Sequence, residues 1–279
     1  MQGRIVRIIS NLFTVDVGGV LYDCNARGKF RKDKIVPLVG DICVIDEKNN
    51  YILEIKNRKN ELKRPMIANV DKALVLSSVK EPNLSLNLLD KQLTTIIYNK
   101  IEPIIILSKL DLLNSDESKE IINIKKYYNS IGINIYENTE YLKIKSEFKD
   151  CLVVLTGQTG AGKSTLLNNL EKELNLKTSP ISKALGRGVH TTRHVELFEI
   201  NGGLVADTPG FSSINFTGMT KEDIKETFIE FKNYPCKFKD CNHIGETACG
   251  VKEAVANDKI LKSRYDNYVK FISEVSKWS

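Results

Sequence analysis

Residues 157–164 read Gly-Gln-Thr-Gly-Ala-Gly-Lys-Ser, and this stretch decides the fold of the chain around it. The pattern G-x-x-x-x-G-K-[ST] lies between an apolar run at residues 151–155, typical of a buried strand, and a segment at 165–170 with apolar residues at helical spacing. The glycines let backbone N–H groups turn towards phosphate oxygens, and the start of the helix adds positive potential. A glycine-rich turn followed by a chance Lys-Ser pair would not need this context. The stretch therefore predicts a nucleotide-binding loop in an α/β domain.

Two side chains of this loop have specific expected roles. The Lys163 amine is expected to reach the β- and γ-phosphates, and the Ser164 hydroxyl to bind Mg²⁺. The loop residues predicted to bind the nucleotide are Gly157, Gln158, Thr159, Gly160, Ala161, Gly162, Lys163, Ser164 and Thr165.

The chain of 279 residues, 42% of them hydrophobic, is long enough for one large or two to three small domains. Its apolar runs are too short to span a bilayer, and charged and polar residues interrupt the N-terminus where a signal peptide would be apolar, so a cytoplasmic location is expected. The net charge is +6, and most of the excess lies in residues 1–64, with 13 Lys and Arg against 8 Asp and Glu. This surplus favours a polyanionic partner for the N-terminal domain, although such values also occur in proteins that bind no nucleic acid.

Three domains are predicted: residues 1–64, 65–219 and 220–279. Short strand-like runs at 3–9, 12–17, 20–25, 41–45 and 51–55 predict a small all-β barrel of the OB type. In the second domain, apolar strands at 69–77 and 101–107 alternate with helices at 88–98 and 115–130, which predicts a parallel α/β sheet. In the third, a helix capped by Thr220 and running to about residue 231, and a helical apolar stripe over 252–278, predict a small α-helical domain.

A basic loop in the first domain surrounds one aromatic residue. Its cations can grip a phosphate backbone while Phe30 stacks on a base, and a solvated loop explains the same pattern. The predicted RNA-binding residues are Arg27, Lys29, Phe30, Arg31 and Lys32.

The predicted strand 101–107 ends in a candidate guanine-recognition element, which is similar to the N-K-x-D motif of GTPases. In that motif the Asp carboxylate accepts two hydrogen bonds from guanine, and adenine cannot supply those donors. Asp111 is therefore the predicted guanine selector, and Ser108 replaces the usual Asn. The predicted guanine-binding residues are Ser108, Lys109, Leu110 and Asp111.

Residues 204–210 form a strand that ends in D-T-P-G, as in the Walker B and switch II element of GTPases. Asp207 is expected to hold Mg²⁺ through water, and the Gly210 N–H to sense the γ-phosphate. Because the guanine element precedes the phosphate loop, the opposite of the usual order, the sequence predicts a circularly permuted GTPase domain.

Residues 186–193 occupy the position of switch I. Thr192 is the expected Mg²⁺ ligand, by resemblance to T-T-R switch segments. Phe211 stands where Ras-like enzymes carry a water-orienting Gln, so intrinsic hydrolysis is expected to be slow. His190 is the candidate catalytic residue, able as a neutral imidazole to bond the attacking water, and a switch histidine without a chemical role explains the residue equally well.

Four soft ligands lie within fourteen residues near the C-terminus, namely Cys236, Cys241, His243 and Cys249. Three thiolates and one imidazole satisfy tetrahedral Zn²⁺ with no open position, which predicts one structural zinc ion. Ordinary free cysteines are the alternative.

Taken together, these motifs resemble the small-subunit-dependent GTPases of the RsgA type, over the whole chain and in the same domain order. The resemblance implies a protein that binds the small ribosomal subunit and its rRNA, hydrolyses GTP faster there and leaves on hydrolysis during late maturation. It also maps the proposed catalytic histidine of that family onto His190. No membrane partner and no obligate dimer are indicated, so a monomer is expected. Alternatives are a P-loop kinase, a non-catalytic GTP-binding RNA module, and a permuted GTPase acting on the large subunit.

Overall fold

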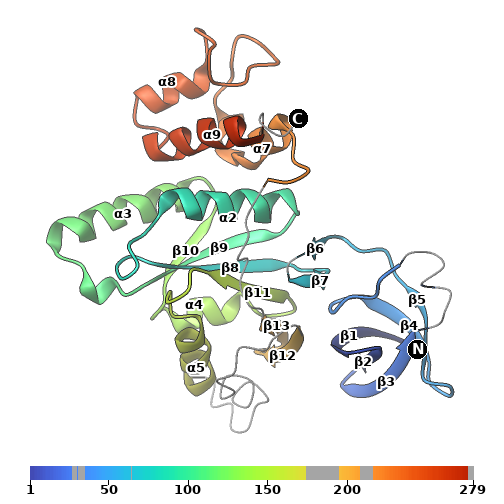
Figure 1. Ribbon diagram of the computed structural model, residues 1–279. Helices are drawn as coiled ribbons and strands as arrows, with labels where there is room; N and C mark the ends of the chain where they lie inside the picture. Colours follow the sequence, from blue (N-terminus) through green and yellow to red (C-terminus); the bar gives the residue numbers. More distant parts are fainter. Residues whose placement is uncertain (27–29, 31–34, 64, 174–194, 208–215, 276–279) are drawn as a thin grey trace.

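The computed structural model describes residues 1–26, 30, 35–63, 65–173, 195–207 and 216–275. They form an N-terminal barrel, a central α/β domain and a helical C-terminal unit that lies on the helices of the central domain (Figure 1). In this part of the chain no helix is long and apolar enough to cross a membrane. The predicted fold classes and their order along the chain are confirmed.

The barrel closes because its first and fourth strands pair. Its strands are β1 (Gln2–Ile9), β2 (Leu12–Val17), β3 (Val20–Ala26), β4 (Ile42–Asp46) and β5 (Tyr51–Ile55). β1, β2 and β3 are antiparallel neighbours, β3 runs parallel to β5, and β4 joins β5 to β1. This is the strand order of an OB fold. The buried core consists of Ile5, Phe13, Val15, Cys24, Phe30, Cys43, Ile45 and Ile52.

The central domain has a parallel sheet in the order β10-β9-β8-β11-β13. Its strands are β8 (Lys72–Ser78), β9 (Glu102–Ser108), β10 (Asn134–Glu137), β11 (Leu152–Gly157) and β13 (Gly203–Asp207), with β12 (Glu196–Ile200) antiparallel beside β13. β8, β9 and β11 are buried along most of their length, because helices cover both faces of a parallel sheet. One face carries α2 (Leu86–Tyr98) and α3 (Ser115–Ser130), and the other carries α4 (Tyr141–Ser146) and α5 (Lys163–Glu173) (Figure 1).

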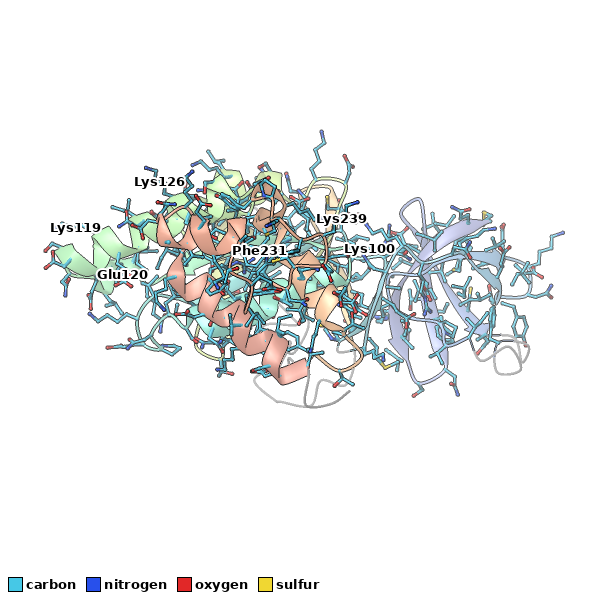
Figure 2. All side chains as sticks on the ribbon, turned by 90° about the horizontal axis from the view of Figure 1, so that it is seen from above. Lys100, Lys119, Glu120, Lys126, Phe231 and Lys239 are labelled. Atoms are coloured by element: carbon cyan, nitrogen blue, oxygen red, sulfur yellow. The ribbon has the colours of Figure 1, made fainter. Side chains whose placement is uncertain are left out.

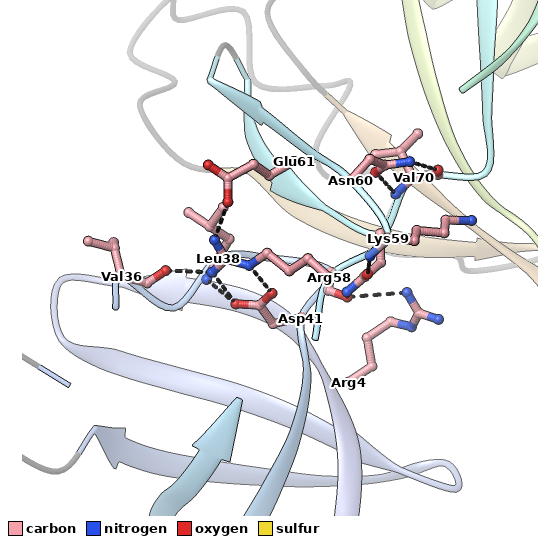
Figure 3. A network of polar contacts seen from close by, with 11 residues as sticks. Arg4, Val36, Leu38, Asp41, Arg58, Lys59, Asn60, Glu61 and Val70 are labelled. Carbon is pink, nitrogen blue, oxygen red and sulfur yellow. Dashed lines mark hydrogen bonds and ion pairs between the residues drawn. The ribbon is translucent and has the colours of Figure 1, made fainter. Parts of the chain in front are cut away.

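The barrel is continuous with this sheet, because β1 pairs with β12 and brings Arg7 opposite Glu196. The hairpin of β6 (Glu61–Lys63) and β7 (Met66–Ala68) completes the junction, and the predicted domain boundary after residue 64 falls between its two strands. Arg58 fastens the hairpin to the barrel by donating from Nε and Nη2 to the two carboxylate oxygens of Asp41, each at 2.7 Å (Figure 3). The Asp41 side chain is fully buried, and its hydrogen bond raises the pKa of Arg58.

The C-terminal unit contains α7 (Lys221–Thr227), the 3-10 helix η2 (Ile229–Asn233), α8 (Gly250–Ala256) and α9 (Lys262–Val275). Thr220 caps α7 as predicted, in a capping box with Asp223. The predicted helix to residue 231 is wrong, because α7 ends at Thr227, with Phe228 as its C-cap, and only a short 3-10 helix follows. The apolar stripe predicted over 252–278 is buried, as at Ile260, Tyr268 and Ile272, but it does not form one helix. It divides at Asn257, the C-cap of α8, and at Asp258, whose φ of 55° cannot continue a helix; residues 276–278 lie outside the described residues.

A buried group of charges joins the C-terminal unit to the central domain. Arg264 on α9 donates to Asp90 on α2 at 2.6 Å and to Glu230 on η2 at 2.8 Å, and all three side chains are at most 1% exposed. The Arg264 guanidinium also lies 4.2 Å from the ring centre of Phe228. The hydroxyl of Tyr128 on α3 donates to Asp90 at 2.7 Å, so four elements share this network.

The view from above shows the consequence of this packing (Figure 2). Phe231 lies among the crowded side chains of the C-terminal unit and is 4% exposed. Lys119 and Lys126 on α3, in contrast, project into solvent. The C-terminal unit is thus packed on the central domain through a buried surface.

We expect Arg264→Ala to lower the free energy of unfolding by about 3–5 kcal/mol, because it leaves two buried carboxylates without their cation. Lys262→Ala is the matched control on the same helix. Its side chain is 80% exposed and, within the described part of the chain, pairs with Asp266 alone, so its loss is expected to change stability by at most about 1 kcal/mol. Urea denaturation of the full chain measures both, and equal losses in the two variants would contradict the assignment.

Candidate functional site

The predicted phosphate loop connects β11 to α5. Gly157, Gly160 and Gly162 have φ values of 142°, 81° and 93°, which glycine adopts without strain. Gly157 pairs with Leu76 in the parallel ladder, and a Cβ atom on Gly157 would lie 2.1 Å from the Leu76 carbonyl oxygen. Glycine is therefore required at the point where the strand turns into the loop.

Lys163 begins α5 and folds back over the loop. Its Nζ donates to the carbonyl oxygens of Gly157 at 2.8 Å and Gln158 at 2.9 Å. Burial lowers the pKa of Lys163, and no carboxylate is hydrogen-bonded to it among the described residues. Ser164 and Thr165 are exposed in the first turn of the same helix. The loop thus gathers an ammonium, two hydroxyls and the N–H groups of a helix start, a combination suited to phosphate.

The predicted guanine element lies at the same edge of the sheet. β9 ends at Ser108, Lys109 follows in the left-handed region at φ 62°, and Asp111 sits exposed in the short helix η1 (Leu110–Leu112). The Lys109 amine donates to the carbonyl of Glu81. Ser108 is 3% exposed, and its hydroxyl donates to the Ala161 carbonyl at 2.7 Å. The structure thus brings residues 108–111 beside the phosphate loop, although about fifty residues separate them in sequence.

One further predicted residue, Asp207, lies at this edge of the sheet, and three others lie outside the described residues. Asp207 is the last residue of β13, which runs parallel to β11. The Asn138 N–H donates to the Leu107 carbonyl at 2.8 Å, so the end of β10 joins the edge as well. His190, Thr192 and Gly210 lie outside the described residues, and their roles stay predictions.

The four predicted metal ligands converge in the C-terminal unit. Their ligand atoms all lie within 4.8 Å of one another. His243 Nδ1 is 3.4 Å from the sulfur atoms of Cys236 and Cys249, which are 3.7 Å apart. Zn–S bonds of about 2.3 Å in a tetrahedron place two sulfur atoms about 3.8 Å apart, so the cluster has the dimensions of a zinc site.

The surroundings of the cluster shift the pKa values of its ligands in different directions. Burial raises the pKa of Cys236, but hydrogen bonds from the backbone N–H groups of Val251 and Gly250, together with those of the Cys249 and Cys241 thiols, outweigh that effect and the net shift is downward. Burial raises the pKa of Cys249, and it raises the pKa of Cys241 to about 12. Burial lowers the pKa of His243, which keeps its imidazole neutral. The hydroxyl of Tyr265 on α9 donates to the His243 carbonyl at 2.6 Å. The apolar stripe of α9 therefore also fixes the metal-binding loop.

The prediction for Phe30 is wrong. Its side chain is 3% exposed and belongs to the barrel core, so its ring presents no face to a base. A small barrel closed by short strands needs bulky apolar side chains to fill its interior. The ring of Phe30 stabilises the protein more when it is buried in that core than when it is exposed on the loop. The four predicted basic residues around it, Arg27, Lys29, Arg31 and Lys32, lie outside the described residues.

Comparison with known proteins identifies the family. A family model described as RsgA GTPase matches residues 51–217, and one described as RsgA N-terminal domain matches residues 2–52. The chain belongs to the RsgA GTPase family. It is accordingly a GTP-hydrolysing enzyme, with the permuted order of motifs that the sequence predicted.

Individual relatives of this RsgA-family chain match nearly its full length. A small ribosomal subunit biogenesis GTPase RsgA of Staphylococcus haemolyticus is 43% identical over 98% of this chain and 97% of its own length, and one of Streptococcus agalactiae is 45% identical over 99% and 95%. Among solved structures, YloQ, a circularly permuted GTPase, is 36% identical with a TM-score of 0.85, covering 100% of this chain and 96% of its own. YjeQ from Thermotoga maritima is 33% identical with a TM-score of 0.84, covering 98% of each chain.

Sequence reasoning missed two buried carboxylates, Asp90 and Glu230, that position the C-terminal unit of this RsgA-family chain. A signal for Asp90 existed, because it lies beside Leu89 and Leu93 on the buried face of α2. An acid on an apolar helical face requires a buried partner, which is Arg264.

Substitution Gly157→Ala is expected to weaken GTP binding by roughly tenfold or more, because the new Cβ displaces the start of the loop from the Leu76 carbonyl. Gly132→Ala is the control. Gly132 also has a positive φ, of 85°, but its Cβ would meet no atom within 4 Å and it lies far from the loop in sequence. Titration with a fluorescent GTP analogue measures both, and wild-type affinity in Gly157→Ala would refute the steric argument.

For the cysteine cluster, purified full-length protein is expected to contain about one equivalent of zinc, and Cys249→Ser less than about half. Cys151→Ser, at a cysteine outside the cluster, should leave the metal content unchanged. Elemental analysis after purification without chelator gives the stoichiometry. A metal-free wild type, or equal loss in both variants, would count against the site.

Proposed function

We propose that this GTPase is activated by the small ribosomal subunit and leaves the subunit when GTP is hydrolysed, late in subunit maturation. The supporting observation is that the phosphate loop, the guanine element and the end of β13 meet at one edge of the central sheet. The central domain that carries this edge contacts the barrel on one side and the C-terminal unit on another. Relatives that match nearly the whole chain carry the name small ribosomal subunit biogenesis GTPase. The chain would act as a monomer in the cytoplasm, where subunits mature.

In this proposal each part of the edge has its own task in binding GTP. Asp111 accepts hydrogen bonds from the guanine edge, with Lys109 and Leu110 beside the base. Lys163 leaves the carbonyls of Gly157 and Gln158 to bond the phosphates, an exchange of partners that keeps its ammonium satisfied.

Hydrolysis requires charge compensation and an oriented water molecule. Mg²⁺ bound with GTP would neutralise charge on the phosphates, held by Ser164, Thr192 and Asp207. His190 orients the attacking water, because Phe211 has no polar group to do so. The Gly210 N–H donates a hydrogen bond to the γ-phosphate. Loss of the γ-phosphate on hydrolysis therefore releases the switch segment.

The basic side chains of residues 27–32 make the contact between the barrel and RNA. With Phe30 buried as an anchor, Arg27, Lys29, Arg31 and Lys32 would bind phosphates without base stacking. The excess charge of residues 1–64 supports this placement. One structural Zn²⁺ held by the four-ligand cluster would keep the C-terminal unit in shape for the same partner.

Purified small subunits are expected to raise GTP turnover at least about tenfold, whereas large subunits should not, and ATP should not be hydrolysed. His190→Ala is expected to reduce the stimulated rate by about 10²-fold without loss of subunit binding, because only the water-orienting group is removed. His194→Ala, four residues along, is the matched control and should retain stimulation. Phosphate release and co-sedimentation with subunits provide the two readouts.

Three results would change the proposal. Stimulation by large subunits alone would show that the partner is the large and not the small subunit. No stimulation by either would refute activation by subunits. A stimulated His190→Ala enzyme would remove this histidine from the mechanism.

A further inference from the structure

We propose that Ser108 is a positioning residue for GTP binding, whose hydroxyl holds the phosphate loop in its binding conformation rather than contacting the base. Ser108 ends β9, and β8 lies between β9 and β11. Its hydroxyl nevertheless crosses the end of β8 and donates to the Ala161 carbonyl at 2.7 Å. The guanine element and the phosphate loop are therefore joined directly by one hydrogen bond.

This bond orients the loop because of peptide geometry. The peptide between Ala161 and Gly162 is trans and planar, so its carbonyl and its N–H point in opposite directions. When Ser108 holds the Ala161 oxygen towards β9, the Gly162 N–H is directed away from β9. Ala161 is fully buried, and the N–H of the preceding peptide, between Gly160 and Ala161, donates to the Gln158 carbonyl at 3.2 Å, so hydrogen bonds hold the peptides on both sides of the Ala161 Cα.

Because of this hydrogen bond, the Ser108 hydroxyl cannot at the same time donate to a second partner such as the base. A serine hydroxyl has one proton, and here the Ala161 carbonyl receives it. The asparagine usual at this position has two amide protons and a carbonyl oxygen, so it can serve two partners. In this chain we assign loop positioning to Ser108, and base selection remains with Asp111, as proposed above.

The backbone of Ser108 is held independently of its side chain. Its carbonyl accepts the Val79 N–H at 3.0 Å, and it pairs with Ser78 in the parallel ladder. Removal of the hydroxyl therefore releases the phosphate loop without detaching the end of β9. The released loop must then be ordered by each nucleotide that binds, which weakens all of them by the same factor.

The test compares GTP with ITP, which lacks the 2-amino group of guanine, in competition against a fluorescent GTP analogue on the full chain. Ser108→Ala is expected to weaken both nucleotides by about 5- to 30-fold, with the ratio of their dissociation constants unchanged within about twofold. Ser108→Thr keeps the hydroxyl and should stay within about threefold of the wild type. Asp111→Asn should change the GTP-to-ITP ratio instead, because it alters the group that accepts from the base.

Ser77→Ala is the matched control, because Ser77 is a buried serine on β8 with 6% exposure. It should leave both dissociation constants unchanged. If Ser108→Ala lowers the melting temperature but keeps wild-type nucleotide affinity, the hydroxyl is only structural and the proposal fails. If it changes the GTP-to-ITP ratio, Ser108 acts on the base and the proposal also fails. None of these measurements uses ribosomal subunits, so the activation proposed above can fail independently of this one.

Discussion

The nucleotide site depends on the parallel hydrogen-bonded ladder of β9, β8 and β11. Leu76 on β8 pairs with Ile106 on one side and with Gly157 on the other, so β11 ends within two residues of the end of β9 at Ser108. The elements that follow them must then meet at one edge, whichever comes first along the chain. The permuted order of motifs is tolerated because strand register, and not sequence order, assembles the site.

Two arginines, the buried Arg264 and the half-buried Arg58, connect the central domain to the domains on either side of that ladder. Arg58 engages Asp41 towards the barrel, and Arg264 engages Asp90 and Glu230 towards the C-terminal unit. Apolar contacts alone would allow several ways of packing, whereas a desolvated guanidinium is satisfied in only one arrangement of its carboxylates. We therefore attribute the defined orientation of the C-terminal unit in part to the buried group of Arg264, Asp90 and Glu230.

Much of the fold and site was predictable because the decisive signals are local. Continuous apolar strands, the glycine loop and the four soft ligands each lie within one short segment, and each occurs where it was expected. The failures concern partners that are remote in sequence. Phe30 is an aromatic among cations until the barrel closes over it, and Arg264 lies 174 residues from Asp90. The break near Asp258 depends on a left-handed residue that helical periodicity does not reveal.

The permutation has a further consequence for how the outer domains relate to the nucleotide. Residues 174–194 lead directly into β12, the strand that pairs with β1 of the barrel. Residues 208–215 lead directly to Phe216, whose ring lies 4.9 Å from that of Phe271 on α9 and under the Lys91 amine of α2. Each predicted switch segment is thus covalently continuous with a residue at a different domain interface. Under the proposed function, a change in either segment on GTP hydrolysis would reach one outer domain directly along the chain, because the permutation places the phosphate loop late in the sequence.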